Sequence, residues 1–214
     1  MMKRLPSQRV AAIALLTTLG ACAPRAAPLA GVPSPSRAIP RIDLPGAHRQ
    51  IVFRWNYEEN AILARGEGAI RTAAPDTARV DLFLTGGVHA GYAVLVGDSI
   101  RAASQERIRR FLPPPALMWA AVGRLAVPSL PDTAVTVQGD TVNAEIGRPA
   151  QWRLRVVGSR LTQLTRLNDG RIAESVTHFQ GGRLLYEVPG RRRLWLGIVR
   201  DEEVPAFDAS IWIR

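Results

Sequence analysis

Residues 51–58 read Ile-Val-Phe-Arg-Trp-Asn-Tyr-Glu, and this stretch decides the fold class. Its odd-numbered positions carry apolar or aromatic side chains, and from residue 54 onward its even-numbered positions are polar. Successive side chains of a β-strand point to opposite faces of the sheet, so this period of two predicts a half-buried antiparallel strand. The segment is therefore expected to lie in a sheet that has one face in the core.

The same alternation recurs along most of the chain, at residues 79–84, 141–146, 151–156 and 207–213. Gly97-Asp98 and Gly139-Asp140 each separate two strand-like runs, as a two-residue hairpin turn does. Longer turns are expected at 168–170 and 180–182. The spacing leaves no room for helical crossovers and predicts about ten to eleven antiparallel strands in a half-open β-barrel.

One segment, residues 105–127, interrupts the strand pattern and is expected to form a helical lid. Residues 105–111 read as a short helix, which Pro113-Pro114-Pro115 ends. Proline is favoured in the first turn of a helix, so a second helix is expected to follow. Apolar residues then recur at helical spacing as far as Leu125. This lid is expected to cover the concave face of the sheet.

A space between lid and sheet would be lined by apolar side chains from both layers. Burying a 16-carbon chain there would yield on the order of 10 kcal/mol before ordering costs. The alternative is that the same side chains simply fill the core of the barrel. The candidate residues for the cavity or the lid are Trp55, Leu82, Leu117, Met118, Trp119, Val122, Leu125 and Trp152.

The N-terminus carries a targeting signal. A basic start, an apolar stretch at 10–19 and small residues before Cys22 are typical of a secretory signal peptide over residues 1–21. Leu19-Gly20-Ala21-Cys22 resembles the bacterial lipobox, which implies a diacylglycerol and an acyl chain on Cys22. Several chains on one cysteine would hold the protein on a membrane. The residue after the cysteine is Ala23 rather than Asp, which favours the periplasmic face of the outer membrane. The alternative is an unmodified cysteine.

Residues 22–48 contain six prolines among small residues. Such a composition favours an extended tether between the lipidated cysteine and a domain at 49–214. The alternative is a linker that packs against the domain.

Composition argues against several classes of function. The 214 residues contain 28 Lys and Arg against 18 Asp and Glu, for a net charge of +10, but the arginines are spread along the chain and predict no nucleic-acid site. One cysteine and three separated histidines predict no metal site. Gly97-Asp98-Ser99-Ile100 is similar to the first block of GDSL esterases, but no histidine has an aspartate three positions before it. No enzymatic activity and no dissociable cofactor are expected.

The lipobox, proline-rich segment, antiparallel strands and apolar helices together resemble the LolA/LolB-like lipoprotein families. Residues 79–88 are similar to a strand and protruding loop of that family, which makes Val88 a candidate membrane contact. Residues 113–128 are similar to its lid helix. The resemblance implies an incomplete barrel that binds acyl chains or other apolar cargo, in a lipoprotein-sorting role. The alternative is an accessory envelope lipoprotein that acts through protein–protein contacts. The oligomeric state stays open.

Overall fold

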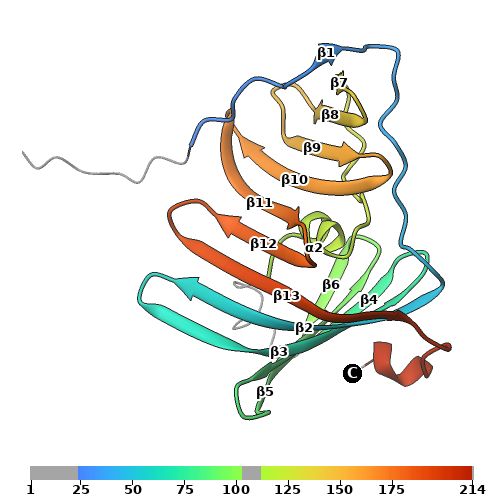
Figure 1. Cartoon of the computed structure of the whole chain (residues 1–214), viewed down its shortest axis with the longest axis vertical. Coiled ribbons are helices and arrows are strands. Elements are labelled where there is room, and N and C mark those ends of the chain that lie inside the picture. Colours follow the sequence, from blue (N-terminus) through green and yellow to red (C-terminus); the bar gives the residue numbers. More distant parts are fainter. Residues whose placement is uncertain (1–23, 103–111, 214) are drawn as a thin grey trace, which may run out of the picture.

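A computed structural model of the protein describes residues 24–102 and 112–213. Thirteen antiparallel strands form one continuous sheet, in the order β1-β7-β8-β9-β10-β11-β12-β13-β2-β3-β4-β5-β6. The sheet curls around a short helix, α2, and its edge strands β1 and β6 do not pair with each other (Figure 1). The described chain is therefore a curved, open sheet with a helix on its concave side.

The elements have these bounds: β1 Val32–Pro33, β2 His48–Glu59, β3 Ile62–Ala73, β4 Thr77–Leu84, β5 His89–Val96, β6 Ser99–Ala102, α2 Pro115–Ala121, β7 Thr133–Gln138, β8 Thr141–Ile146, β9 Trp152–Val157, β10 Arg160–Asn168, β11 Arg171–Phe179, β12 Arg183–Val188, β13 Arg192–Glu203 and the 3-10 helix η1 Ala209–Trp212.

The alternation in residues 51–58 is confirmed as the inner face of β2. Phe53 and Trp55 are 1% and 6% exposed, and they lie opposite Gly68 and Gly66 of β3. A Cβ atom at residue 68 would lie 2.3 Å from Cζ of Phe53, so the aromatic ring occupies the space that a side chain would need. Glycines on β3 thus let two large rings lie flat against the sheet.

The antiparallel fold is as expected, but the strand count is wrong: the sheet has thirteen strands and is not a barrel of ten or eleven. One addition is β1, which the proline-rich segment contributes by pairing Val32 with Val137 of β7. The alternation at 207–213 forms no strand; instead η1 starts there, with Asp208 accepting a hydrogen bond from the Ser210 amide at 2.8 Å. Alternating apolar residues therefore do not by themselves make a segment pair as a strand.

The proline-rich residues 24–47, here called the strap, run along the sheet instead of standing clear of it. Ala26 N donates to the Gly170 carbonyl at 2.9 Å, and Leu125 N donates to the Ile42 carbonyl at the same distance. Ile42 is 8% exposed and lies in the main core cluster. The described part therefore follows the alternative of a packed linker, because its few apolar side chains find places in the core.

Helix α2 is shorter than the expected lid and lies on the concave face. Pro114 caps it and Pro115 is its first residue, as the triple proline predicts. Gly123, at φ +85°, ends it: its amide donates to the Ala120 carbonyl at 3.0 Å. Leu125 consequently lies beyond the helix. The short helix expected at 105–111 falls outside the described residues.

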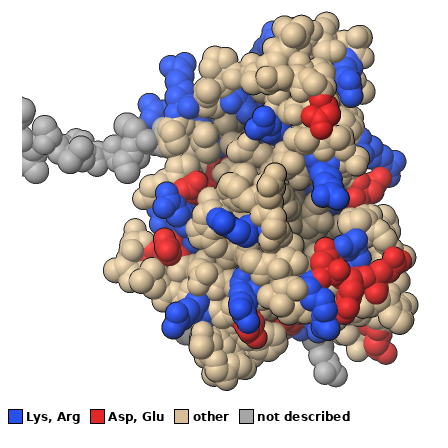
Figure 2. Space-filling model, viewed as in Figure 1, with Lys and Arg blue, Asp and Glu red and all other residues tan. Residues whose placement is uncertain are grey.

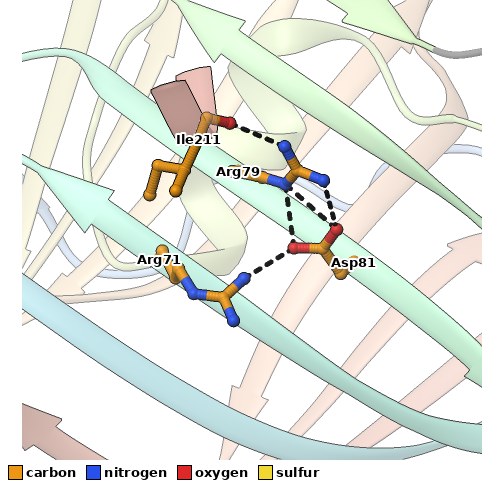
Figure 3. Close-up of polar contacts among 4 residues, drawn as sticks. All are labelled: Arg71, Arg79, Asp81 and Ile211. Atoms are coloured by element: carbon orange, nitrogen blue, oxygen red, sulfur yellow. Dashed lines mark hydrogen bonds and ion pairs between the residues drawn. The ribbon is translucent and has the colours of Figure 1, made fainter. Parts of the chain in front are cut away.

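The convex face of the sheet holds the C-terminal residues in place. Arg79 donates to the Ile211 carbonyl of η1 at 2.6 Å and to both oxygens of Asp81 on its own strand (Figure 3). Arg71 of β3 donates to the same carboxylate at 2.7 Å. This ion-pair cluster attaches η1 to β4, on the side of the molecule away from the first described residues (Figure 1).

Candidate functional site

An open cleft of about 660 Å³ lies where the chain enters α2. Its volume falls in the range of small-ligand sites in proteins. Three parts of the chain form it: the β5–β6 turn, the proline run before α2, and the inward faces of β10 to β13. The lining residues are Asp98, Ser99, Ile100, Leu112, Pro113, Pro114, Pro115, Arg166, Ala173, Glu174, Tyr186, Val188, Arg191 and Arg192.

One wall of the cleft is apolar. Leu112 and Pro113–Pro115 line it in succession, and Ile100 of β6 adds a branched side chain. Proline has no backbone N–H, so this wall offers fewer hydrogen-bond donors than ordinary chain would. A hydrocarbon segment can lie against it without leaving backbone amides unpaired.

The strands β10 to β13 contribute the polar wall of the cleft, which includes a buried carboxylate. Glu174 of β11 accepts hydrogen bonds from Tyr186 Oη at 2.8 Å and from Arg166 Nε at 2.7 Å. Burial, followed by the nearby Glu174 charge, raises the pKa of the Tyr186 phenol well above its ordinary value. Tyr186 therefore remains a protonated donor that holds Glu174 in position.

A second buried carboxylate, Glu59, lies at the end of β2 next to this wall. Arg192 Nη2 donates to it at 2.9 Å, Arg191 Nε donates at 3.0 Å, and Tyr57 Oη donates to its other oxygen. The hydrogen bond from Tyr57 is the main cause that lowers the pKa of Glu59, and both arginines add to it. Burial, with the bond to Glu59, raises the pKa of Tyr57 to about 12. This pairing keeps the Arg192 side chain charged although it is only 6% exposed.

The guanidinium groups of Arg166 and Arg191 reach the mouth of the cleft. Their side chains are 45% and 65% exposed, whereas their carboxylate partners are 8% exposed. Each arginine therefore pairs through one edge and keeps other N–H donors on its solvent side. Those donors are suited to a carboxylate or phosphate.

The predicted cavity residues lie in the core and not in this cleft. Leu117 and Trp119 of α2 are completely buried, and Trp55, Met118 and Trp152 are 6–8% exposed. Leu82, Val122 and Leu125 pack against these clusters as partly buried residues. The eight side chains are distributed over three core clusters, and none lines the 660 Å³ cleft. A ligand contact by any of them stays a prediction.

Of the other two predicted site residues, the structure describes Val88 but not Cys22. Val88 is 62% exposed at the β4–β5 loop, whose Leu84 N donates to the Val88 carbonyl at 2.8 Å. Its contact with a membrane stays a prediction. Cys22 and residues 1–21 lie outside the described residues.

The sequence contained a signal for the polar wall that the alternation argument did not use. The inward phase of β2 continues from Trp55 through Tyr57 to Glu59, which places a carboxylate on the core face. On β13 the same phase places Arg192 directly opposite Glu59. Opposite charges at inward positions of neighbouring strands indicate a buried pair.

Features of other site classes were not found in the described chain. Ser99 Oγ lies 3.4 Å from Asp98 Oδ1, and no histidine is among the residues that line the cleft, so a serine nucleophile there has no base among them. Within residues 24–102 and 112–213, no group of three or more metal-binding side chains comes together. None of the helices in these ranges has the length and apolar character needed to cross a bilayer.

Comparisons with known proteins give similarity in fold only. No family model matches the sequence, and no curated protein is similar to it. A LolA superfamily protein from Nitrosomonas europaea is similar in structure, with a TM-score of 0.48 and 10% identity over 79% of this chain and 91% of that chain. A DUF1329 family protein from Desulfovibrio piger gives 0.41 and 5% over 78% and 89%. A domain from Vibrio parahaemolyticus named for outer membrane lipoprotein sorting gives 0.34 and 8% over 78% and 89%. At these values the matches place the chain in no family.

Proposed function

We propose that the protein is a non-enzymatic, lipid-anchored envelope protein that binds amphiphilic molecules carrying an acyl chain. The observation that supports this most directly is the cleft beside α2, which is lined both by prolines and by arginines paired with carboxylates. A single ligand that satisfies both walls needs a hydrocarbon part and a polar head. The anchor on Cys22, the periplasmic face of the outer membrane and a role in lipoprotein sorting belong to the same proposal.

The polar wall decides where each part of the ligand lies. A hydrocarbon chain placed over Arg166 and Arg191 would remove water from two charged groups without replacing their hydrogen bonds. An anionic head placed there accepts hydrogen bonds from their exposed edges, while the acyl chain lies along Leu112 and the prolines. The ligand class that fits is thus an anionic amphiphile, such as a fatty acid or the acylated end of a larger molecule.

The experiment uses residues 22–214 with Cys22→Ala, here called the unanchored protein. It contains every described residue, so all contacts of the fold and the cleft are retained. Native mass spectrometry should show a bound acyl-chain species, and palmitate should displace a bound apolar dye.

A variant pair links this binding to the cleft. Ala173→Trp places a large ring in the cleft and should abolish dye uptake, because Ala173 lines it. Ala206→Trp places the same ring on an exposed loop and should leave uptake unchanged. Bare protein with no dye uptake would reject the amphiphile proposal and favour an accessory lipoprotein that works through protein–protein contacts. Absence of palmitate labelling on wild-type protein in cells would reject the anchor.

A further inference from the structure

Three hairpin turns lie along one side of the sheet, at the left in Figure 1. They connect β2 to β3, β10 to β11 and β12 to β13. The register brings the first and third together, because Glu59 pairs with both Ile62 and Arg192. We call this side the hairpin rim.

The β2–β3 turn presents two large apolar side chains to solvent. Ile62 is 55% exposed and Leu63 is 77% exposed. They are consecutive residues of a strand, so they point to opposite faces of the hairpin, and β4 does not cover them because it pairs with β3 only from Gly66 onward. Together they give the tip apolar area that can be buried at a membrane interface.

The start of the described chain lies on the same rim. Ile172 N donates to the Pro24 carbonyl at 2.9 Å, and Arg25 forms an isolated bridge with Arg171 at the start of β11. Pro24 is therefore fixed beside the β10–β11 turn, only two residues after Cys22. A two-residue connection spans about 7 Å at most. An anchor on Cys22 would consequently hold the hairpin rim close to the bilayer.

The distribution of charged side chains favours the same orientation relative to a membrane. The β12–β13 turn carries Arg191 and Arg193, both exposed, and Arg25 lies exposed on the strap. The largest group of acidic atoms lies on the right-hand side of Figure 2, and smaller acidic groups lie among the arginines on the left. The rim arginines Arg191 and Arg193 pair with Glu59 and Glu187 but keep exposed edges that can bind anionic head groups.

We infer that the hairpin rim lies on an anionic lipid bilayer, with Ile62 and Leu63 of the β2–β3 tip inserted among the head groups. The inference rests on the proposed function for the presence of a membrane, and adds which surface meets it. Tip insertion is separate from cargo binding, because neither residue lines the cleft.

The test measures binding of the unanchored protein to vesicles made of equal parts phosphatidylglycerol and phosphatidylethanolamine. Ile62→Ser/Leu63→Ser should weaken binding about tenfold, because interfacial affinity scales with the apolar area buried. Val199→Ser/Ile213→Ser is the matched control. Those side chains are 60% and 80% exposed but lie away from the rim, and the control should bind as the unanchored protein does. Phosphatidylcholine vesicles should bind more weakly than the anionic ones.

Each contrary result has a defined meaning. Vesicle binding that is absent, that is unchanged in the tip variant, or that falls equally in the control would overturn the inference. Binding of equal strength to phosphatidylcholine would overturn the role of charge. Dye uptake by the same samples is an independent readout of the cleft. The tip variant should take up dye as the unanchored protein does, and an unanchored protein that binds vesicles but takes up no dye would reject the cargo proposal alone.

Discussion

Trp119 is the residue at which a core role and a cavity-wall role for α2 can be separated by experiment. Its side chain is completely buried, and Nε1 donates to the Gly97 carbonyl at 2.6 Å. The guanidinium carbon of Arg124 lies 4.6 Å from the ring centroid. The perturbation is Trp119→Phe, which removes the donor and part of the ring but keeps an aromatic side chain.

The expected loss has two parts. The missing hydrogen bond costs about 1 kcal/mol, since Gly97 is only partly buried and water can replace the donor. The space left by the smaller ring costs a further ~1–2 kcal/mol, because buried neighbours collapse only partly into a void. Together these lower the free energy of unfolding by about 2–3 kcal/mol, which for a chain of this size lowers Tm by roughly 4–12 °C.

The assay is urea unfolding of the unanchored protein, followed by far-ultraviolet circular dichroism, with dye uptake measured on the same samples. Trp195→Phe is the control: this ring lies on the convex side against Phe179, with a centroid separation of 5.6 Å, and the change should cost less than about 1 kcal/mol. Unchanged stability of Trp119→Phe together with weakened palmitate binding would refute the core assignment and show that Trp119 is a cavity wall.

Three further predictions test the packing of the sheet, the strap and the helix. Gly66→Ala should destabilise the protein by about 1–3 kcal/mol in urea unfolding, because its Cβ would lie 1.8 Å from a backbone oxygen, whereas Gly197→Ala, with nothing within 4 Å, should be neutral. Ile42→Ala should lower the free energy of unfolding by about 2–4 kcal/mol if the strap is part of the core, whereas Val32→Ala, at a position 72% exposed, should lower it little. Equally small effects of the two substitutions would favour a tether that does not pack against the domain. Burial lowers the pKa of His178, so the unfolded chain takes up the proton at a higher pH than the folded protein does. The free energy of unfolding should therefore fall as pH drops below about 6.5. His178→Gln should flatten that fall, and an unaltered pH profile would contradict the buried, neutral state of His178.

Local patterns predicted the strands because one physical cause, a half-buried sheet, determines both the pattern and the structure. The hairpin at Gly97-Asp98 shows this: Gly97 has φ +57°, and β5 and β6 meet across the turn with Val96 opposite Ser99. The strap was not predicted from its composition, since six prolines indicate an extended chain but not what lies beside it. Ile42 becomes part of the core because α2 and the strands β7 to β12 together form a cluster that includes it.

The cleft was harder to predict than the sheet, because it forms between segments far apart in the sequence. The alternation argument treated apolar residues as inward and charged residues as outward. Glu59, Arg192 and Glu174 break that rule, because each finds a partner on another strand or across a hairpin. The phase of a strand can mark such a charge as inward, but its partner cannot be identified until the strand register is known.

Arg191 belongs both to the cleft lining and to the hairpin rim, and this connects the two proposals. Its guanidinium group donates to Glu59 inside, while its exposed edge lies at the turn between β12 and β13. If the rim lies on the bilayer, the mouth of the cleft meets the head-group layer, and a ligand can enter with its anionic group following the arginines. An acyl chain would then reach the proline wall with little exposure to bulk water. This removes most of the free-energy cost of exposing the chain to water during its transfer from the bilayer. This arrangement predicts that the protein takes up its ligand through direct contact with vesicles. The rate of binding from dispersed palmitate should be lower.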